Sequence, residues 1–266
     1  MRQKVKRRGI GSKLMAGKSI QSGKKKSIWL VVAMLVLLLV IGGCVIYVND
    51  YYHPLDSAQD ALMTTVTVRT YQLEDGAWVF EPLDTEISKG MIFYPGGKVA
   101  YEAYAPLMGM LAEEGFLCVL PEMPANLAVL DMDAAKEYPG QFPQVTEWYL
   151  GGHSLGGSMA ASYVAEHAQE YEGLVLLAAY STADLKDSGL QVLSVYGSED
   201  GVLDMEKYEE YKANLPEDFH EKIIQGGNHA YFGSYGFQDG DGEANIRNEE
   251  QLQLTVEFIN SAFTKY

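Results

Sequence analysis

The chain contains 266 residues, of which 47% are hydrophobic and 21% are charged. This composition excludes a disordered or fibrous protein, and the length allows one sizeable domain or at most two small ones. Two cysteines cannot build a disulfide scaffold, and five histidines without clustering argue against a zinc module. The net charge of −16 argues against nucleic-acid binding, because a phosphate backbone would repel such a surface.

Charge is distributed very unevenly along the chain. Residues 1–27 hold ten of the twenty basic residues, and the first acidic residue is Asp50. The uncharged stretch 28–48 would span roughly 31 Å as a helix at about 1.5 Å per residue, which is enough to cross a bilayer core. We therefore predict a transmembrane signal-anchor helix at 28–48 that lies in the lipid bilayer. Because Lys and Arg resist translocation, we expect 1–27 to be a basic cytoplasmic tail and everything after residue 48 to be extracellular.

Processing of this segment is the alternative to a signal anchor. Ile41-Gly42-Gly43-Cys44 resembles a lipoprotein processing box, which would leave Cys44 as a lipidated N-terminus. The apolar run continues from Val45 to Val48 beyond that cysteine, which favours Cys44 as an ordinary helix residue. Both interpretations tether an acidic, exposed domain to a membrane.

Beyond the apolar stretch, we expect a linker at 49–64 and a folded domain at 65–266. The domain alternates apolar runs of strand length with segments of helical periodicity. Strands are expected at 66–71, 78–81, 91–94, 116–120, 148–151, 174–179, 191–196 and 221–224, and helices at 100–114, 126–138, 158–169, 205–214 and 249–263. The first two strands flank a Glu74-Asp75-Gly76 turn, as in a hairpin. The alternation predicts an α/β fold with a mostly parallel, doubly wound sheet and helices on both faces.

The segment Gly152-His153-Ser154-Leu155-Gly156 fits the pattern Gly-x-Ser-x-Gly and follows a predicted strand. In a parallel sheet, chemistry takes place at the carboxyl ends of the strands, where this segment lies. Two glycines allow a sharp strand-to-helix turn that lifts the serine hydroxyl above the sheet. We interpret Ser154 as a nucleophile, and the alternative is a small residue in a tight turn.

A serine nucleophile needs a base, and the base needs an acid that orients it. In this kind of fold the expected chain order is serine, acid, histidine. His229 is the only histidine in a loop after the last predicted strand, so it is the candidate base. The other histidines lie in less suitable places: His53 in the linker, His153 inside the turn, His167 on a helix and His220 at a strand start.

The acid is expected just after the strand that precedes the one leading to the base. Asp200 follows that strand and stands before a glycine, in a turn that suits an inward-pointing carboxylate. Glu199 and Asp204 remain alternatives, and Asp187 fits poorly. Asp200 is therefore the candidate acid.

Two backbone N–H groups are expected to bind the oxyanion that forms during acyl transfer. One is the N–H of Leu155, at the start of the helix after the nucleophile. The second is expected from the loop after an earlier strand, here Tyr94-Pro95-Gly96-Gly97-Lys98. We favour Gly97 in that loop, with Gly96 and an ordinary turn as alternatives.

Four segments together resemble the α/β-hydrolase superfamily, and within it a dienelactone-hydrolase-like bacterial family: Phe93 to Val99, Gly152 to Gly157, Tyr196 to Asp200 and Gly227 to Ala230. The resemblance covers about residues 65–263. It implies the α/β-hydrolase fold, a triad of Ser154, Asp200 and His229, and oxyanion donors at Leu155 and Gly97. The nucleophile position holds serine, whereas true dienelactone hydrolases use cysteine, and this argues against dienelactone as the substrate.

These observations predict a membrane-anchored extracytoplasmic serine hydrolase that cleaves an ester-type acyl bond through an acyl-enzyme. An acyltransferase or thioesterase with the same triad, and a non-catalytic binding protein on this fold, are the alternatives. Only residues 181–190 lie where related proteins insert a cap, so we expect no large cap domain, and 123–143 is placed to cover part of the site. The expected substrate is a small-molecule ester or an ester group on a larger polymer.

No cofactor, metal or nucleic-acid partner is predicted. The acidic run 239–243 has part of a calcium-loop pattern, but Ala244 stands where an EF-hand requires glycine. No phosphate-binding Gly-x-x-x-x-Gly-Lys motif is present. We interpret 239–243 as a solvated loop before the last helix.

Overall fold

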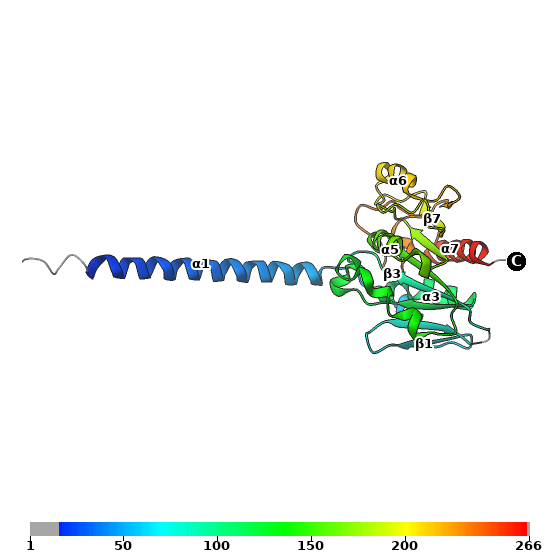
Figure 1. Cartoon of the computed structure of the whole chain (residues 1–266), viewed down its shortest axis with the longest axis horizontal. Helices are drawn as coiled ribbons and strands as arrows, with labels where there is room; N and C mark the ends of the chain where they lie inside the picture. Colours follow the sequence, from blue (N-terminus) through cyan, green and yellow to red (C-terminus); the bar gives the residue numbers. More distant parts are fainter. Residues whose placement is uncertain (1–15, 84, 265–266) are drawn as a thin grey trace, which may run out of the picture. The chain divides into compact units, whose positions relative to one another are not determined.

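The computed structural model describes residues 16–83 and 85–264, and the chain divides into two compact units, Met1–Asn49 and Asp50–Tyr266. The first unit contains one long helix, α1 (Ala16–Asn49), drawn in blue in Figure 1. Its part Trp29–Asn49 has a mean hydropathy of 3.0 and no buried residue, so it is long and apolar enough to cross a membrane. A signal sequence would satisfy the same criteria. The first fifteen residues of the predicted basic tail lie outside the described residues.

The described part of the second unit contains one eight-stranded sheet. Its strands are β1 (Val68–Gln72), β2 (Trp78–Pro82), β3 (Lys89–Tyr94), β4 (Phe116–Leu120), β5 (Glu147–His153), β6 (Gly173–Leu177), β7 (Gln191–Gly197) and β8 (His220–Ile224). Their order across the sheet is β1-β2-β4-β3-β5-β6-β7-β8. β1 and β2 form the predicted hairpin, β2 also pairs antiparallel with β4, and all remaining pairs are parallel.

Two apolar cores lie on opposite faces of this sheet, because successive side chains on a strand point to opposite sides. On β3, Met91 and Phe93 belong to one core, whereas Ile92 and Tyr94 belong to the other. α3 (Ala105–Glu113) and α7 (Asn248–Phe263) contribute to the first core, and α5 (Leu155–Glu166) contributes to the second. Helices therefore cover both faces, and the predicted doubly wound architecture is confirmed (Figure 1).

The remaining elements are short. The α-helices among them are α2 (Asp56–Asp60), α4 (Tyr138–Gln141) and α6 (Met205–Tyr211). The 3-10 turns are η1 (Tyr101–Tyr104), η2 (Pro124–Asn126), η3 (Ala128–Leu130), η4 (Met132–Ala135), η5 (Ala168–Glu170), η6 (Lys212–Asn214) and η7 (Ala230–Phe232). Residues 178–190, between β6 and β7, contain neither helix nor strand, so no cap domain is inserted there.

The helix predicted at 126–138 is wrong. The chain forms η2, η3 and η4 there, and α4 begins only at Tyr138. Asn126 has φ 55°, Leu127 has φ −133° and ψ 104°, and Asp131 has φ −152° and ψ 69°, and residues with such backbone angles cannot belong to a right-handed helix. The apolar residues whose spacing suggested a helix instead lie in a series of turns.

The segment expected as a linker at 49–64 is built into the second unit. Tyr52 forms a parallel bridge with Val99, and α2 follows four residues later. The side chain of Ala58 on α2 is buried. The boundary between the two units lies directly after Asn49, so residues 50–64 belong to the second unit.

Candidate active site

Ser154 lies between the end of β5 and the start of α5. Its backbone has φ 53° and ψ −123°, a conformation that a residue with a side chain rarely adopts. The Ser154 N–H donates to the carbonyl oxygen of Leu177 on the neighbouring strand at 2.9 Å, which holds the turn against the sheet. The turn places the serine above the carboxyl edge of the sheet, as the Gly-x-Ser-x-Gly pattern predicts.

The two glycines of this pattern are required by close backbone approach. A Cβ added to Gly152 would lie 2.6 Å from the carbonyl carbon of Gly156. A Cβ added to Gly156 would collide with the carbonyl oxygen of Pro95 in the loop after β3. The absence of side chains at these positions lets the start of α5 pack directly against that loop.

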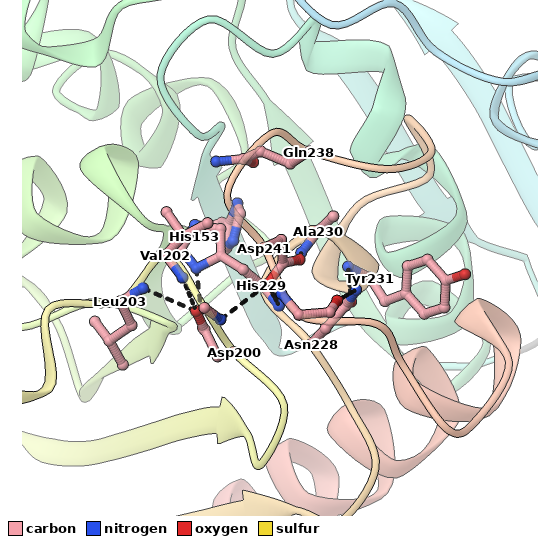
Figure 2. Close-up of polar contacts among 12 residues, drawn as sticks. His153, Asp200, Val202, Leu203, Asn228, His229, Ala230, Tyr231, Gln238 and Asp241 are labelled. Carbon is pink, nitrogen blue, oxygen red and sulfur yellow. Dashed lines mark hydrogen bonds and ion pairs between the residues drawn. The ribbon is translucent and has the colours of Figure 1, made fainter.

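The candidate acid Asp200 follows the end of β7 and is held by three hydrogen bonds (Figure 2). Its Oδ1 accepts from the backbone N–H groups of Val202 at 2.9 Å and Leu203 at 2.8 Å. Its Oδ2 lies 2.9 Å from Nδ1 of His229, and both side chains are 1% exposed. The carboxylate is thus fixed with one oxygen aimed at the candidate base.

The structure separates Asp200 from its alternatives. The Glu199 carboxylate accepts from the Ser198 hydroxyl at 2.9 Å. Asp204 caps α6, accepting from the Lys207 N–H at 3.2 Å, and forms an ion pair with the same lysine. Neither carboxylate has a hydrogen bond to His229 in the described structure.

His229 lies in the loop after β8, as predicted. Nδ1 contacts Asp200, so Nε2 is the nitrogen left to face a reacting group. This Nε2 is buried and has no hydrogen-bond partner among the described residues. His229 and Ser154 line the same cavity, of about 260 Å³.

This cavity has mostly apolar walls. Its other lining residues are Leu155, Ser158, Ala178, Ala179, Tyr180, Val202, Leu203 and Asp204. Its volume is slightly below the range of about 300–1,000 Å³ typical for sites that enclose drug-sized ligands. Residues 123–143, expected to cover part of the site, are not among its walls.

In the loop after β3, the backbone N–H of Gly97 lies between two N–H groups that already donate hydrogen bonds within the protein. Gly96 N–H donates to the Tyr104 hydroxyl at 3.0 Å, and Lys98 N–H donates to the carbonyl of Asn126 at 2.8 Å. A Cβ on the intervening Gly97 would lie 2.9 Å from the Leu155 side chain, so this glycine packs against the start of α5. Leu155, as the first residue of α5, has no carbonyl of its own helix to receive its N–H.

His153, inside the Gly-x-Ser-x-Gly segment, belongs to the site in a way that the sequence did not indicate. Its Nδ1 lies 2.8 Å from the Tyr104 hydroxyl, and its ring centroid lies 4.5 Å from that of His229. Complete burial, together with the nearby His229, lowers the pKa of His153 well below its ordinary value. His153 is therefore a neutral group that connects the base to the loop after β3.

Asp241 is the second group that sequence reasoning missed (Figure 2). Its carboxylate accepts backbone hydrogen bonds from His229 at 3.2 Å, Ala230 at 2.8 Å and Gly201 at 3.1 Å. It thereby ties the loop of the acid to the loop of the base. The acidic run 239–243 suggested only a solvated loop, and no cluster of metal-binding side chains is found among the described residues.

Comparison with solved structures shows the same fold in several hydrolases. Est1E from Butyrivibrio proteoclasticus has a TM-score of 0.54 at 14% identity, with 75% of this chain and all of that chain covered. Esterase 2 from Thermogutta terrifontis, in a form phosphoramylated by tabun, has a TM-score of 0.51 at 14% identity, covering 76% and 97%. A CIB-like hydrolase from Thermoplasma acidophilum has a TM-score of 0.53 at 16% identity, covering 73% and 98%.

A search of curated proteins gives no match. A comparison with known protein families matches residues 90–253 to the one described as "Alpha/beta hydrolase family". The matched region runs from β3 into α7 and includes the Ser154 turn, Asp200 and His229. The chain therefore belongs to the alpha/beta hydrolase family.

Proposed function

We propose that this protein is a membrane-anchored serine hydrolase that cleaves an ester-type acyl bond through Ser154, His229 and Asp200. The observation that carries the proposal is the buried 2.9 Å contact between Asp200 and His229, beside a serine on a strained strand-to-helix turn. If Asp200 and His229 formed only a structural ion pair, the strained left-handed backbone of Ser154, which lines the same cavity, would have no explanation.

The proposed reaction begins with His229 removing the proton of the Ser154 hydroxyl as its oxygen attacks the acyl carbonyl. Asp200 holds the imidazole through Nδ1 and stabilises the charged imidazolium that forms. The alcohol leaves with the proton from His229, and an acyl group remains on Ser154. Water activated by His229 then releases the acid and restores the serine.

Leu155 and Gly97 are the proposed oxyanion donors. The N–H of Leu155 stands at the N-terminus of α5, where the helix dipole also favours negative charge. Gly97 is preferred to Gly96, because the Gly96 N–H is already donated to Tyr104. Each such donor contributes about 3 kcal/mol to transition-state stabilisation in comparable sites.

The proposed substrate is an ester. The proposed enzyme is a member of a dienelactone-hydrolase-like group that uses serine as its nucleophile. Two of the proteins with the same fold are esterases, and one of them is described as phosphoramylated by tabun. The open cavity at Ser154 suits a small ester or an ester group that projects from a larger molecule. The predicted triad has no role for a cofactor.

The apolar part of α1 serves as a signal anchor in this proposal. Residues 1–27 are then cytoplasmic and the hydrolase unit is extracellular, because the basic residues precede the apolar stretch. Cys44 is an exposed thiol on this helix and is treated as part of the anchor, with lipidation as the alternative.

The experiment uses the full-length protein in detergent micelles. A fluorophosphonate probe is added, and the adduct is located by mass spectrometry in the wild type, Ser154→Ala and His229→Ala. We expect an adduct on Ser154 in the wild type and none in either variant. A folded wild-type protein without an adduct would overturn the proposal in favour of a non-catalytic binding protein.

A further inference from the structure

The residues that follow α1 bind directly to the loop that carries the proposed oxyanion donor Gly97. Tyr52 N–H donates to the Lys98 carbonyl at 2.8 Å, and Ala100 N–H donates to the Tyr52 carbonyl at 2.9 Å. The Lys98 ammonium lies 2.8 Å from the Asp50 carboxylate. The hydrogen bond and the positive charge of Lys98 lower the pKa of Asp50.

These contacts build the residues directly after α1 into the hydrolase unit. Asp50 follows Asn49, the last residue of α1, and Tyr52 comes two residues later. Residues 50–64 therefore belong to the second unit and supply no long flexible tether, which favours a substrate in the membrane over a distant polymer.

The segment that contacts the same loop continues into turns with exposed apolar side chains. The Lys98 N–H donates to Asn126, and Leu127 lies 3.7 Å from the position of a Cβ on Gly97. In the turns that follow, Val129 is 49% exposed, Leu130 58% and Met132 42%. Clustered apolar side chains beside a reaction site mark a surface for an apolar ligand, because exposing them to water is unfavourable.

The cavity at Ser154 is separately lined mostly by apolar residues. Apart from Ser154, Ser158, Asp204 and His229, its walls are formed by aliphatic and aromatic residues. Burial of an acyl chain against such walls is favourable, because it removes apolar surface from water. The apolar turns and the cavity together therefore favour a long acyl group over a polar substituent.

We propose that the ester cleaved at Ser154 is carried by a membrane lipid, and that Leu127, Val129, Leu130 and Met132 contact its acyl chain. The inference rests on the proposed function. The Ser154 oxygen bonds to the acyl carbon as the bond to the lipid alcohol breaks, and that alcohol takes the proton from His229. Water then supplies the hydroxyl of the released fatty acid and the proton that returns to Ser154.

Charge narrows the class of lipid further. All 36 acidic residues lie beyond residue 48, with only ten basic residues among them. A surface of this sign repels anionic headgroups. The lipid is therefore neutral or zwitterionic, such as an acylglycerol or a choline phospholipid.

The test uses the full-length protein in phosphatidylcholine nanodiscs that contain a fluorogenic diacylglycerol ester. The rate on this lipid is divided by the rate on a water-soluble short-chain ester, measured on the same preparation. The variant Val129→Ser/Leu130→Ser removes two exposed apolar side chains beside the site. Val66→Ser, at a position 88% exposed in the segment before β1, is the matched control.

We expect wild type and Val66→Ser to share one ratio, and the double variant to lower it by about tenfold, since partial burial of two such side chains contributes about 1.4 kcal/mol or more. The inference is overturned if the ratio is the same in the double variant, or if an acylated polysaccharide is cleaved in preference to the lipid. Loss of both activities together with absent fluorophosphonate labelling would contradict the proposed function instead.

Discussion

The imidazole rings of His153 and His229 lie with their centroids 4.5 Å apart and their planes tilted by 52°. Each ring has a different partner at Nδ1: the Tyr104 hydroxyl for His153, and the Asp200 carboxylate for His229. An anionic partner stabilises a protonated imidazole, whereas a buried phenol does not. The same side chain therefore occurs twice in the site, once with a carboxylate partner and once with a phenol partner, and the second ring, His153, is kept neutral by burial.

The contact between Asp200 and His229 predicts the effect of Asp200→Asn. The amide keeps an acceptor for the Val202 and Leu203 N–H groups, but it loses the charge that stabilises the imidazolium. We expect kcat for a soluble ester to fall by on the order of 10³–10⁴, with little change in KM. Steady-state kinetics and a thermal melt of the same preparation check this. The matched variant is Glu199→Gln, whose carboxylate is not bonded to His229; equal losses in the two variants would contradict the assignment of Asp200.

The hydrogen bonds of the Tyr104 hydroxyl predict how Tyr104→Phe affects the loop that carries Gly97. Tyr104→Phe keeps the ring but leaves the Gly96 N–H and His153 without this partner. We expect kcat to fall by roughly 10- to 100-fold at nearly constant KM, with about 1–3 kcal/mol lost from the free energy of unfolding.

Tyr101→Phe is the control for this experiment. It removes another largely buried tyrosine hydroxyl, one that donates to the carbonyl of Gly76 at 3.1 Å outside the site. We expect it to change stability without a comparable change in kcat. If both variants lower kcat equally, Tyr104 contributes only to the general packing of the fold.

The parts of the site that could be predicted from the sequence are those that depend on local backbone demands and chain order. Gly152 and Gly156 surround a serine in a turn that only glycines permit, so the pattern is readable in five residues. Asp200 and His229 were predicted from their places after successive strands, and the structure brings them to 2.9 Å. Their roles in a reaction stay predictions until the labelling experiment.

The residues that could not be predicted act across long stretches of chain. Tyr104 and His153 are 49 residues apart in sequence, and Asp241 reaches the Gly201 N–H across 40 residues. No local pattern encodes such contacts, because they depend on how irregular loops are packed. The mistaken helix at 126–138 has a similar origin, since non-helical backbone angles at Asn126, Leu127 and Asp131 override the apolar spacing.

His153 predicts how stability depends on pH. Its pKa is lowered in the folded protein, so below about pH 6.5 the unfolded chain binds a proton that the folded chain does not. The stability contributed by the neutral, buried ring is present above that pH and is lost as the pH falls, with a slope of up to about 1.4 kcal/mol per pH unit.

Denaturant unfolding of the full-length protein in micelles at pH 5.0, 6.0 and 7.5 measures this slope. In His153→Asn the amide oxygen can take the place of Nδ1 as acceptor from Tyr104, but it does not titrate. We expect the variant to lose less stability than the wild type between pH 7.5 and 5.0. Parallel curves for the two proteins would show that His153 titrates in the folded state.

The hydrogen bonds of Asp241 predict that a residue outside the proposed triad controls the geometry of both Asp200 and His229. In Asp241→Asn one of the two carboxylate oxygens becomes an NH₂ group facing the backbone N–H of His229 or Ala230, which donate to those oxygens in the wild type. Two donors then oppose each other, and where the NH₂ group replaces Oδ1 the connection through the Gly201 N–H, which donates to that oxygen, is lost as well.

We expect Asp241→Asn to lower kcat for a soluble ester by about 10- to 100-fold while KM changes less than threefold, since small displacements of a base are costly to catalysis. Asp239→Asn is the matched control, because it removes the same charge from an exposed position in the same loop. If kcat of Asp241→Asn lies within twofold of kcat of Asp239→Asn, the loop that carries His229 keeps its position without the Asp241 carboxylate. A fall confined to the Asp241 variant would show that its backbone hydrogen bonds, and not the charge of the loop, hold His229 in place.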